Sequence, residues 1–462
     1  MKFKVEIKNF GKIERATIQI NNLTVLAGKN NVGKSFISKA LYAFFHAMNT
    51  DHLHRTLITY IDELSEILNT LKSSIPYYNA KDDEFITKTQ NILSILKAKL
   101  LTIQNVPFSE KLSIIDSIAN PTEWLEQTFI AYQKQISSKK RKLAGITFFL
   151  ERMEKIINQL AKYIDKKENT ATTIAQNLGD AFENELKLNF QINKLQELKR
   201  TNSIDFTSFN IENVGKIRVS NKVNFSMTAN GLDTLQQFSQ VIYLESPIYW
   251  KLKSALESHF SRTFHKLWQR GGRTYLIGVP HYFYNLVDLL RLQSTDEPQF
   301  KDILENISQE IGGRLHLSNE GNLVFQTQKE GTHPISITAL GVANLGMIAL
   351  LLEKNLIDKG TFLFIDEPEA HLHPAWQVTL MKTLYQLASE GINIIITTHS
   401  IDMLKCLEIL VKENAKAKEL IALNHLGSDG YALNEDVEFE KKIGLMKQDL
   451  LEPFYNLYLE GL

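Results

Sequence analysis

The chain has 462 residues, of which 44% are hydrophobic, and its 52 Lys and Arg residues balance its 52 Asp and Glu residues. This length allows two domains, or one domain with a large insertion, and the composition is that of an ordinary globular protein. The net charge of zero excludes an overall attraction to nucleic acid or anionic membranes, and the single cysteine, Cys406, excludes an internal disulfide.

The first residues and the apolar runs favour a cytoplasmic protein. Residues Met1–Ile7 alternate charged and apolar side chains, which is unlike a signal peptide. Apolar runs such as Met347–Leu352 are far shorter than the roughly 20 residues that span a bilayer. A single cysteine also suits a reducing compartment. We therefore expect a cytoplasmic location and no membrane span in this chain.

The N-terminal segment predicts strands and then a helix. Alternating apolar residues between Lys2 and Ala27 indicate two strands, and the spacing from Ser35 to Met48 predicts a helix buried on most sides. From Asp51 to Arg200 turn residues become scarce and helix-forming residues dominate. We expect residues 51–204 to form a helical insertion into a core made of residues 1–50 and 205–462.

One stretch of the expected insertion carries an apolar stripe. Phe149, Met153, Ile156, Leu160 and Tyr163 share one helix face. A short coiled-coil seam is one interpretation. Packing on neighbouring helices is favoured, because a coiled coil needs at least three or four heptads. Pro107 and Pro121 are expected to interrupt the segment, which argues against a long arm.

The remainder of the chain predicts strands that alternate with helices. Strand patterns occupy Phe206–Met227 and Val241–Glu245, and a hairpin is expected between Arg314 and Gln326. The later predicted elements are helices 342–353, 375–390 and 401–412 and strands 362–365 and 392–396, with further helices near 250–269 and 282–292. Such alternation predicts an α/β fold with a parallel sheet covered on both faces.

A phosphate-binding motif follows the first strands. Residues 28–35 read Gly-Lys-Asn-Asn-Val-Gly-Lys-Ser, which satisfies the G-x-x-x-x-G-K-[ST] pattern between a strand and a helix. Backbone N–H groups of such a loop cradle phosphates, the lysine reaches the β- and γ-phosphates, and the serine hydroxyl binds Mg²⁺. The expected nucleotide-binding residues are Gly28, Lys29, Asn30, Asn31, Val32, Gly33, Lys34, Ser35 and Phe36, with Ser35 also a metal ligand.

Two further strands end in polar residues. Phe362–Ile365 precede Asp366 and Glu367, so Asp366 can hold Mg²⁺ and Glu367 can act as general base on the attacking water. Ile394–Ile396 precede Thr397, Thr398 and His399. A neutral imidazole there can hydrogen-bond a γ-phosphate or help to place the water. These residues predict a Mg·ATP site.

The order of these motifs resembles a known group of enzymes. A phosphate loop, a long insertion, an Asp-Glu-Pro strand and a Thr-Thr-His-Ser strand resemble the ABC-type ATPases of the RecF, SMC and OLD group. Residues 7–35, 362–377 and 394–400 are similar to small prokaryotic ATPases often described as AAA-15 or AAA-21. The resemblance covers Met1–Met48 and Glu310–Cys406 and implies an ABC-type ATPase head with a mixed β N-terminal lobe and a parallel-sheet core.

The resemblance also implies partners. In that group two protomers sandwich ATP, each offering a signature helix to the other's nucleotide, so we expect a homodimer or a higher homo-oligomer. The matching residues here are Gly341 and Asn344, although Leu340 stands where the group has a serine. Loss of that hydroxyl predicts slow turnover. The candidates for the Gln that contacts Mg²⁺ in this group lie near Gln236–Gln240 and rest on position alone.

The group includes the ATPase subunits of phage-defence systems such as OLD nucleases, PARIS and Septu. We find no nuclease motif among the roughly sixty residues after His399, so the resemblance implies control of a separately encoded nuclease or toxin. Two alternatives stay open: a DNA repair or chromosome-maintenance ATPase, and a nucleotide-gated scaffold with negligible turnover. DNA contact would use the basic run Ser138–Lys142, although such a run is more often a solvated helix face.

Overall fold

The computed structural model describes most of the chain in two compact units. The larger unit comprises Met1–Asn49, Gly179–Gly231 and Gln237–Leu462, and the helical unit comprises Thr50–Leu178 and Leu232–Gln236. The described residues are 2–49, 52–74, 79–101, 108–137, 144–164, 170–201, 205–227, 240–245, 249–251, 278–291, 297–318, 322–329 and 331–459.

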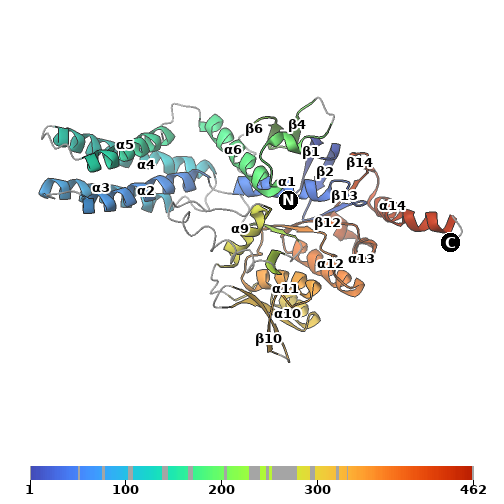
Figure 1. Cartoon of the computed structure of the whole chain (residues 1–462). Helices are drawn as coiled ribbons and strands as arrows, with labels where there is room; N and C mark the ends of the chain where they lie inside the picture. Colours follow the sequence, from blue (N-terminus) through green and yellow to red (C-terminus); the bar gives the residue numbers. More distant parts are fainter. Residues whose placement is uncertain are drawn as a thin grey trace. The chain divides into compact units, whose positions relative to one another are not determined.

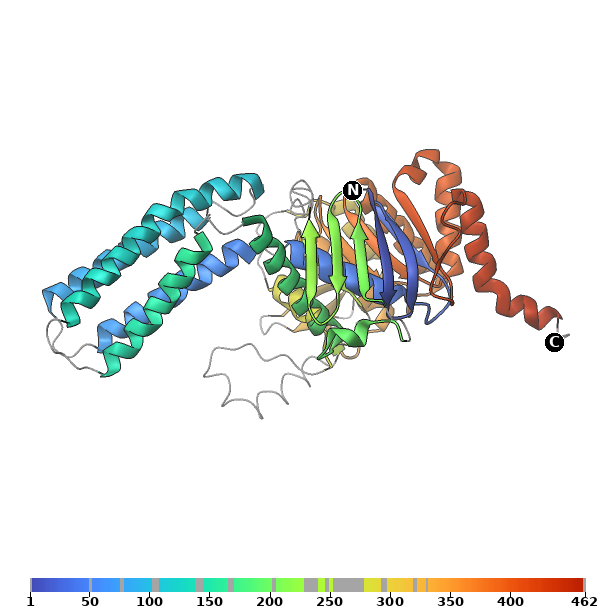
Figure 2. The same ribbon diagram turned by 90° about the horizontal axis from the view of Figure 1, so that it is seen from above.

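An antiparallel sheet in the larger unit joins segments that lie about two hundred residues apart. Its strand order is β2-β1-β4-β5-β6, and β1 pairs with β4 so that Val5 lies opposite Ile211. Figure 2 shows the green strands of the later segment beside the blue N-terminal strands. The strands are β1 (Phe3–Phe10), β2 (Ile13–Ile20), β4 (Thr207–Ile211), β5 (Gly215–Val219) and β6 (Val223–Met227).

The central sheet of the larger unit carries the predicted motifs. Its order is β14-β13-β3-β12-β11-β7, and all neighbouring pairs are parallel except β13 with β14. The strands are β3 (Leu23–Ala27), β7 (Val241–Leu244), β11 (Phe362–Asp366), β12 (Asn393–Thr398), β13 (Ile421–Leu426) and β14 (Ala432–Leu433). Because β3, β12 and β11 are neighbours, their carboxyl ends meet at one edge.

Helix α1 (Lys34–Asn49) lies between the two sheets. The ring centroid of Phe45 is 6.0 Å from that of Phe3 in β1 and 4.4 Å from that of Phe362 in β11. Eleven residues of α1 are buried, so the prediction of a helix buried on most sides is confirmed. The antiparallel sheet and the central sheet thus share a core through this helix.

The remaining elements of the larger unit pack around this core (Figure 1). Helix α12 contacts β12 and β3, and α14 contacts β13. A small antiparallel sheet has the order β10-β9-β8. The elements are α9 (His281–Leu290), α10 (Lys301–Glu310), β8 (Gly313–Leu317), β9 (Leu323–Thr327), β10 (Gly331–Pro334), α11 (Leu340–Glu353), α12 (Pro374–Ser389), α13 (Ile401–Glu413) and α14 (Phe439–Leu459), with 3₁₀ turns η1 (Leu195–Leu198) and η3 (Ala415–Glu419).

The helical unit contains α2 (His52–Ser74), α3 (Ala80–Leu101), α4 (Phe108–Ser137), α5 (Ala144–Ile164) and the start of α6 (Thr170–Phe190). Figures 1 and 2 show α2 to α5 side by side. The stripe residues Met153, Ile156 and Leu160 are buried in one hydrophobic cluster, where α5 contacts α2 and α4. The favoured interpretation, packing on neighbouring helices, is thus the arrangement found.

Two expectations on local structure need correction. Lys2–Ala27 forms three strands, because a turn at Asn21 and Asn22 separates β2 from β3. Pro121 does not interrupt the helical segment but lies inside α4. A proline cannot donate a hydrogen bond to the carbonyl four residues before it, which here is the carbonyl of Ser117. Lys99 Nζ of α3 donates to this carbonyl oxygen at 2.6 Å. A tertiary hydrogen bond thus replaces the lost helical one.

The boundary between the units differs from the predicted limit at residue 204. The chain joins the larger unit from Gly179 onward, within α6. Phe182 is fully buried, with its ring centroid 5.8 Å from Phe44 of α1 and 6.0 Å from Phe209 of β4. Phe182, in the second half of α6, therefore packs in the core between α1 and β4. Among the described residues, no helix is both long and apolar enough to cross a bilayer.

Candidate nucleotide-binding site

The loop between β3 and α1 requires glycine. Gly28 has φ 153° and Gly33 has φ 101°, and Asn31 adopts the left-handed region at φ 65°. A Cβ at Gly28 would lie 2.5 Å from the carbonyl oxygen of Leu426 in β13, a separation that excludes a side chain. The close approach of two strands therefore shapes the loop into a cradle that suits phosphate oxygens.

The Lys34 side chain lies inside this loop. Its Nζ donates to the carbonyl oxygen of Gly28 at 2.9 Å and to that of Lys29 at 2.7 Å, and the residue is buried. Burial lowers the pKa of the Lys34 ammonium, while the carboxylates of Glu367, Glu369 and Asp366 oppose that shift. The cation thus faces both the phosphate cradle and the acidic residues.

Ser35 and Asp366 meet across the sheet edge. Burial raises the pKa of Asp366, and hydrogen bonds with Thr397 and Ser35 oppose that shift. Thr397 Oγ1 donates to Asp366 Oδ1 at 2.5 Å. A hydroxyl and a carboxylate are the hard oxygen donors that Mg²⁺ prefers, and Mg²⁺ commonly uses one or two carboxylates together with substrate phosphates. Among the described residues, no group of three or more His, Cys, Asp or Glu could hold a metal alone.

Glu367 and His399 lie next to each other. Glu367 adopts φ 48°, and its N–H donates to Thr397 Oγ1 at 3.0 Å, which holds this unusual backbone. His399 Nδ1 is 3.5 Å from Glu367 Oε1. Their hydrogen bond lowers the pKa of Glu367 and raises the pKa of His399. Glu367 is therefore ionised near neutral pH and can accept a proton.

Comparison with known proteins agrees with this geometry. The family description "AAA ATPase domain" (AAA_15) matches residues 1–404. The chain belongs to this AAA ATPase domain family. Its fold class is confirmed as α/β, with a largely parallel central sheet and a large helical insertion, whereas the N-terminal sheet is antiparallel and not the mixed sheet expected.

Solved structures with some likeness include SMC head domains. A head bound to the C-winged helix domain of ScpA is 10% identical, with 93% of this chain and 95% of that chain covered and a TM-score of 0.38. The head from Thermotoga maritima is 10% identical, with 92% and 94% covered and a TM-score of 0.29. The head with coiled coil and joint from Pyrococcus yayanosii is 12% identical, with 97% and 99% covered and a TM-score of 0.34.

The predicted signature residues contact the loop after β11 in this ATPase domain. A Cβ at Gly341 would lie 2.6 Å from the carbonyl oxygen of His371, and Asn344 Nδ2 donates to the carbonyl oxygen of Ala370 at 3.1 Å. Leu340 is the first residue of α11. Within one chain, Gly341 and Asn344 are thus held against this loop, and Asn344 also lines a pocket with Asp366 and Glu367. Lys34, Ser35, Asp366, Glu367 and His399 gather at the edge of the sheet.

The other predicted loop residues differ in their surroundings. Asn30 is exposed, whereas Val32 is buried. Lys29 forms ion pairs with Asp449, at 3.1 Å, and with Glu452, both in α14. The Phe36 ring packs with Phe10 and Phe190, with centroids 5.2 and 4.8 Å apart. Phe36 therefore offers a nucleotide only its backbone.

Several stretches named from the sequence lie outside the described residues. They are Pro107, the basic run at 138–142, residues 236–239 of the stretch searched for a Mg-sensing Gln, and residues 252–269 of the helix predicted near 250–269. Gln240 is described, and its carbonyl oxygen accepts from Phe362 N at 2.8 Å.

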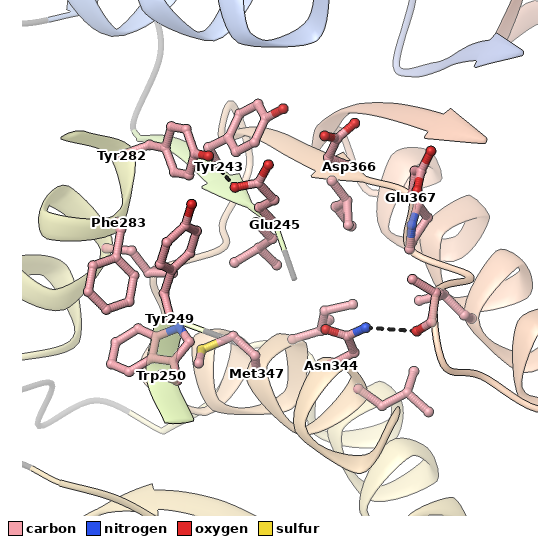
Figure 3. Close-up of a pocket in the computed structure, with 18 residues that line it drawn as sticks. Tyr243, Glu245, Tyr249, Trp250, Tyr282, Phe283, Asn344, Met347, Asp366 and Glu367 are labelled. Carbon is pink, nitrogen blue, oxygen red and sulfur yellow. Dashed lines mark hydrogen bonds between the residues drawn. The ribbon is translucent and has the colours of Figure 1, made fainter. Parts of the chain in front are cut away.

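A pocket of about 320 Å³ lies beside the acidic pair. Figure 3 shows Asp366 and Glu367 on one side and aromatic rings, including Tyr282, on the other. Glu245, directly after β7, accepts from Lys39 Nζ at 2.8 Å and from the Tyr282 hydroxyl. Sequence reasoning missed Glu245. The only signal for it is its position after a short apolar strand.

Proposed function

We propose that this ATPase domain binds and hydrolyses Mg·ATP at the edge of the central sheet. The observation that carries the proposal is that the loop before α1 and Asp366, from segments more than three hundred residues apart, come together where β3, β12 and β11 pair in parallel, with Ala27 opposite Thr398 and Asp366 opposite Thr397. Together with Lys34 inside its loop, this arrangement is what a magnesium-bound triphosphate requires.

The residues divide the chemistry among them. Gly28–Ser35 hold the phosphates, and Lys34 offsets their negative charge. Ser35 and Asp366 would hold Mg²⁺, which would offset negative charge on the phosphates. Glu367 accepts the proton of the water that attacks the γ-phosphate, and ADP leaves. His399 helps to place this water or a phosphate oxygen.

The direct test is phosphate release from ATP by the full chain. We expect Mg²⁺-dependent release that stops when EDTA is added, and that stops in Asp366→Asn, which loses one ionised metal ligand. Release that continues in Asp366→Asn at the wild-type rate would show that the activity comes from another site or from a contaminant.

We further propose that two copies enclose ATP, each presenting the N-terminus of its α11 to the nucleotide of the other. Helix α11 begins at Leu340 without a side-chain cap on Ala339, so its first N–H groups are available for a phosphate. Light scattering after size exclusion tests the assembly. A mass that doubles with ATP supports it, and a mass that is the same with and without ATP argues against it.

The biological role we propose is ATP-dependent control of a separate nuclease or toxin in anti-phage defence. The resemblance of the three motifs to the ATPase subunits of defence systems supports it. A neighbouring gene for such an effector, and phage sensitivity on deletion of either gene, are expected. An unchanged response to phages together with no effector gene would count against this role.

Leu340 supports a second candidate, a nucleotide-gated scaffold with little turnover. In other enzymes, deleting a donor to the transition state slows the reaction by about 10²–10³. With Leu340 in place of a serine, ATP would be hydrolysed slowly and the ATP-bound assembly would persist. Measuring ATP-induced dimerisation and phosphate release on the same sample separates the two. Assembly at full extent with negligible release would favour the scaffold, and release at several turnovers per minute would exclude it.

A further inference from the structure

Glu369 has surroundings that the proposed roles do not use. It follows Asp366, Glu367 and Pro368 in a loop, where a solvated acidic side chain is expected, yet it is buried. Its Oε1 accepts from Thr398 Oγ1 at 2.7 Å and from the backbone N–H of His399 at 2.8 Å. Burying a carboxylate is costly unless hydrogen bonds or charges compensate it.

The compensation of Glu369 is incomplete. Its Oε2 is buried and has no hydrogen-bond partner among the described residues, and burial raises the pKa of this carboxyl group. A purely structural acceptor for two donors could be a neutral side chain at lower cost. The use of a carboxylate here therefore points to its negative charge.

The charge faces the His399 ring. His399 Nδ1 is 3.3 Å from Glu369 Oε1 and 3.5 Å from Glu367 Oε1. An ionised carboxylate only accepts hydrogen bonds, so when both carboxylates are ionised, Nδ1 between their oxygens carries the proton. This assigns Nδ1–H to the acidic side of the ring and leaves Nε2 for the nucleotide. A carboxylate that orients an imidazole in this way fixes both its tautomer and its angle.

We propose that Glu369 is a positioning residue for His399. It holds the end of β12 through Thr398 and the His399 backbone, and it holds the imidazole so that Nδ1 faces Glu367. The proposal rests on the proposed function of His399 in ATP hydrolysis, because Glu369 acts through that side chain.

The charged groups that face His399 set the direction of a measurable effect. They are Glu367 and Glu369 from the loop after β11 and Lys34 from α1. The hydrogen bond with Glu367 raises the pKa of His399, burial lowers it, the charge of Glu369 raises it and that of Lys34 lowers it. Replacing Glu369 with a neutral residue should therefore move the titration of His399 to lower pH.

The main test variant is Glu369→Gln, which keeps an acceptor oxygen for Thr398 and for the His399 backbone but removes the charge. We expect kcat to fall about tenfold or more, while the affinity for Mg·ATP stays within about twofold of the wild type. In protein labelled at histidine carbons, the His399 signal, assigned by its loss in His399→Asn, should titrate at lower pH. Glu390→Gln, at the exposed C-terminal end of α12, is the matched control and should change none of these.

Each outcome decides between explanations. A wild-type kcat and an unmoved His399 titration in Glu369→Gln would overturn the proposal. If Glu369 is only structural, binding and kcat should fall together with the folded fraction in thermal melts, and this result would overturn it too. If the wild type does not hydrolyse ATP, the proposed function fails, but the His399 titration still tests the positioning. Glu369→Ala, which also removes the oxygen that accepts from Thr398 and from the His399 backbone, should lower kcat further than Glu369→Gln.

Discussion

Thr397→Val tests how the central sheet holds the acidic residues. Thr397 is fully buried, its Oγ1 donates to Asp366 Oδ1 at 2.5 Å, and the same oxygen accepts from Glu367 N at 3.0 Å. Valine has nearly the same shape but removes both hydrogen bonds. One partly buried carboxylate oxygen and one partly buried N–H are then left without this partner.

The expected cost follows from these two bonds. A hydrogen bond to a charged group contributes about 1.5–3 kcal/mol, and a neutral one about 0.5–1.5 kcal/mol. Thr397→Val should therefore lower the free energy of unfolding by about 2–4.5 kcal/mol. It should also slow ATP hydrolysis, because Glu367 loses the contact that holds its left-handed backbone at φ 48°.

Urea unfolding of the full chain, with Thr207→Val as control, measures this cost. Thr207 is equally buried, lies in the same unit, and donates to the neutral carbonyl of Asn9 at 2.6 Å. The control should lose only about 0.5–1.5 kcal/mol. Equal losses in the two variants would refute the reasoning that Thr397 stabilises the partly buried Asp366 carboxylate.

Three further predictions concern single residues. Lys34→Ala should abolish the heat of Mg·ATP binding in calorimetry, and a wild-type titration would remove Lys34 from the phosphate site. Glu367→Gln should bind ATP, release phosphate about 100-fold more slowly and accumulate as an ATP-bound dimer; unchanged release would exclude the general-base role. Burial raises the pKa of Glu185, but hydrogen bonds from His281 and His46 lower it more, so that it lies below 4.5. A lowered carboxyl pKa stabilises the fold above the ordinary pKa, and this contribution is lost as the pH falls. The stability gap between the wild type and Glu185→Gln should therefore shrink from about pH 7 to about pH 3, and a constant gap would contradict the pairing.

The motifs could be predicted because each is a short continuous segment. A strand, a glycine-rich loop and a lysine at the start of a helix follow one another within Val25–Ser35. The strand before Asp366 and the strand before His399 likewise have clear apolar patterns and polar ends. Their convergence follows from a parallel sheet, whose strands end at one edge.

The contacts within the site depend on register, which no local pattern contains. Asp366 and Thr397 become partners because β11 and β12 pair with these two residues opposite each other. Glu369 looks like a solvated residue of an acidic turn until Thr398 and His399 are placed beside it. A shift of one residue between these strands would reverse which side chains face the helices and would break both contacts.

The same limit explains the misjudged elements. Pro121 reads as a helix breaker until Lys99, from another helix, is placed on the carbonyl that the proline frees. The second half of α6 reads as part of the insertion, but Phe182 packs with Phe44 and Phe209. In each case a residue distant in sequence decides the local structure.

The most direct test is a crystal structure of the chain with Mg²⁺ and a nonhydrolysable ATP analogue. It should show Lys34 on the β- and γ-phosphates, Ser35 and Asp366 at the metal, and Glu367 beside the position of the attacking water. An analogue bound elsewhere, or bound with Asp366 remote from its metal, would contradict the assignment of this site.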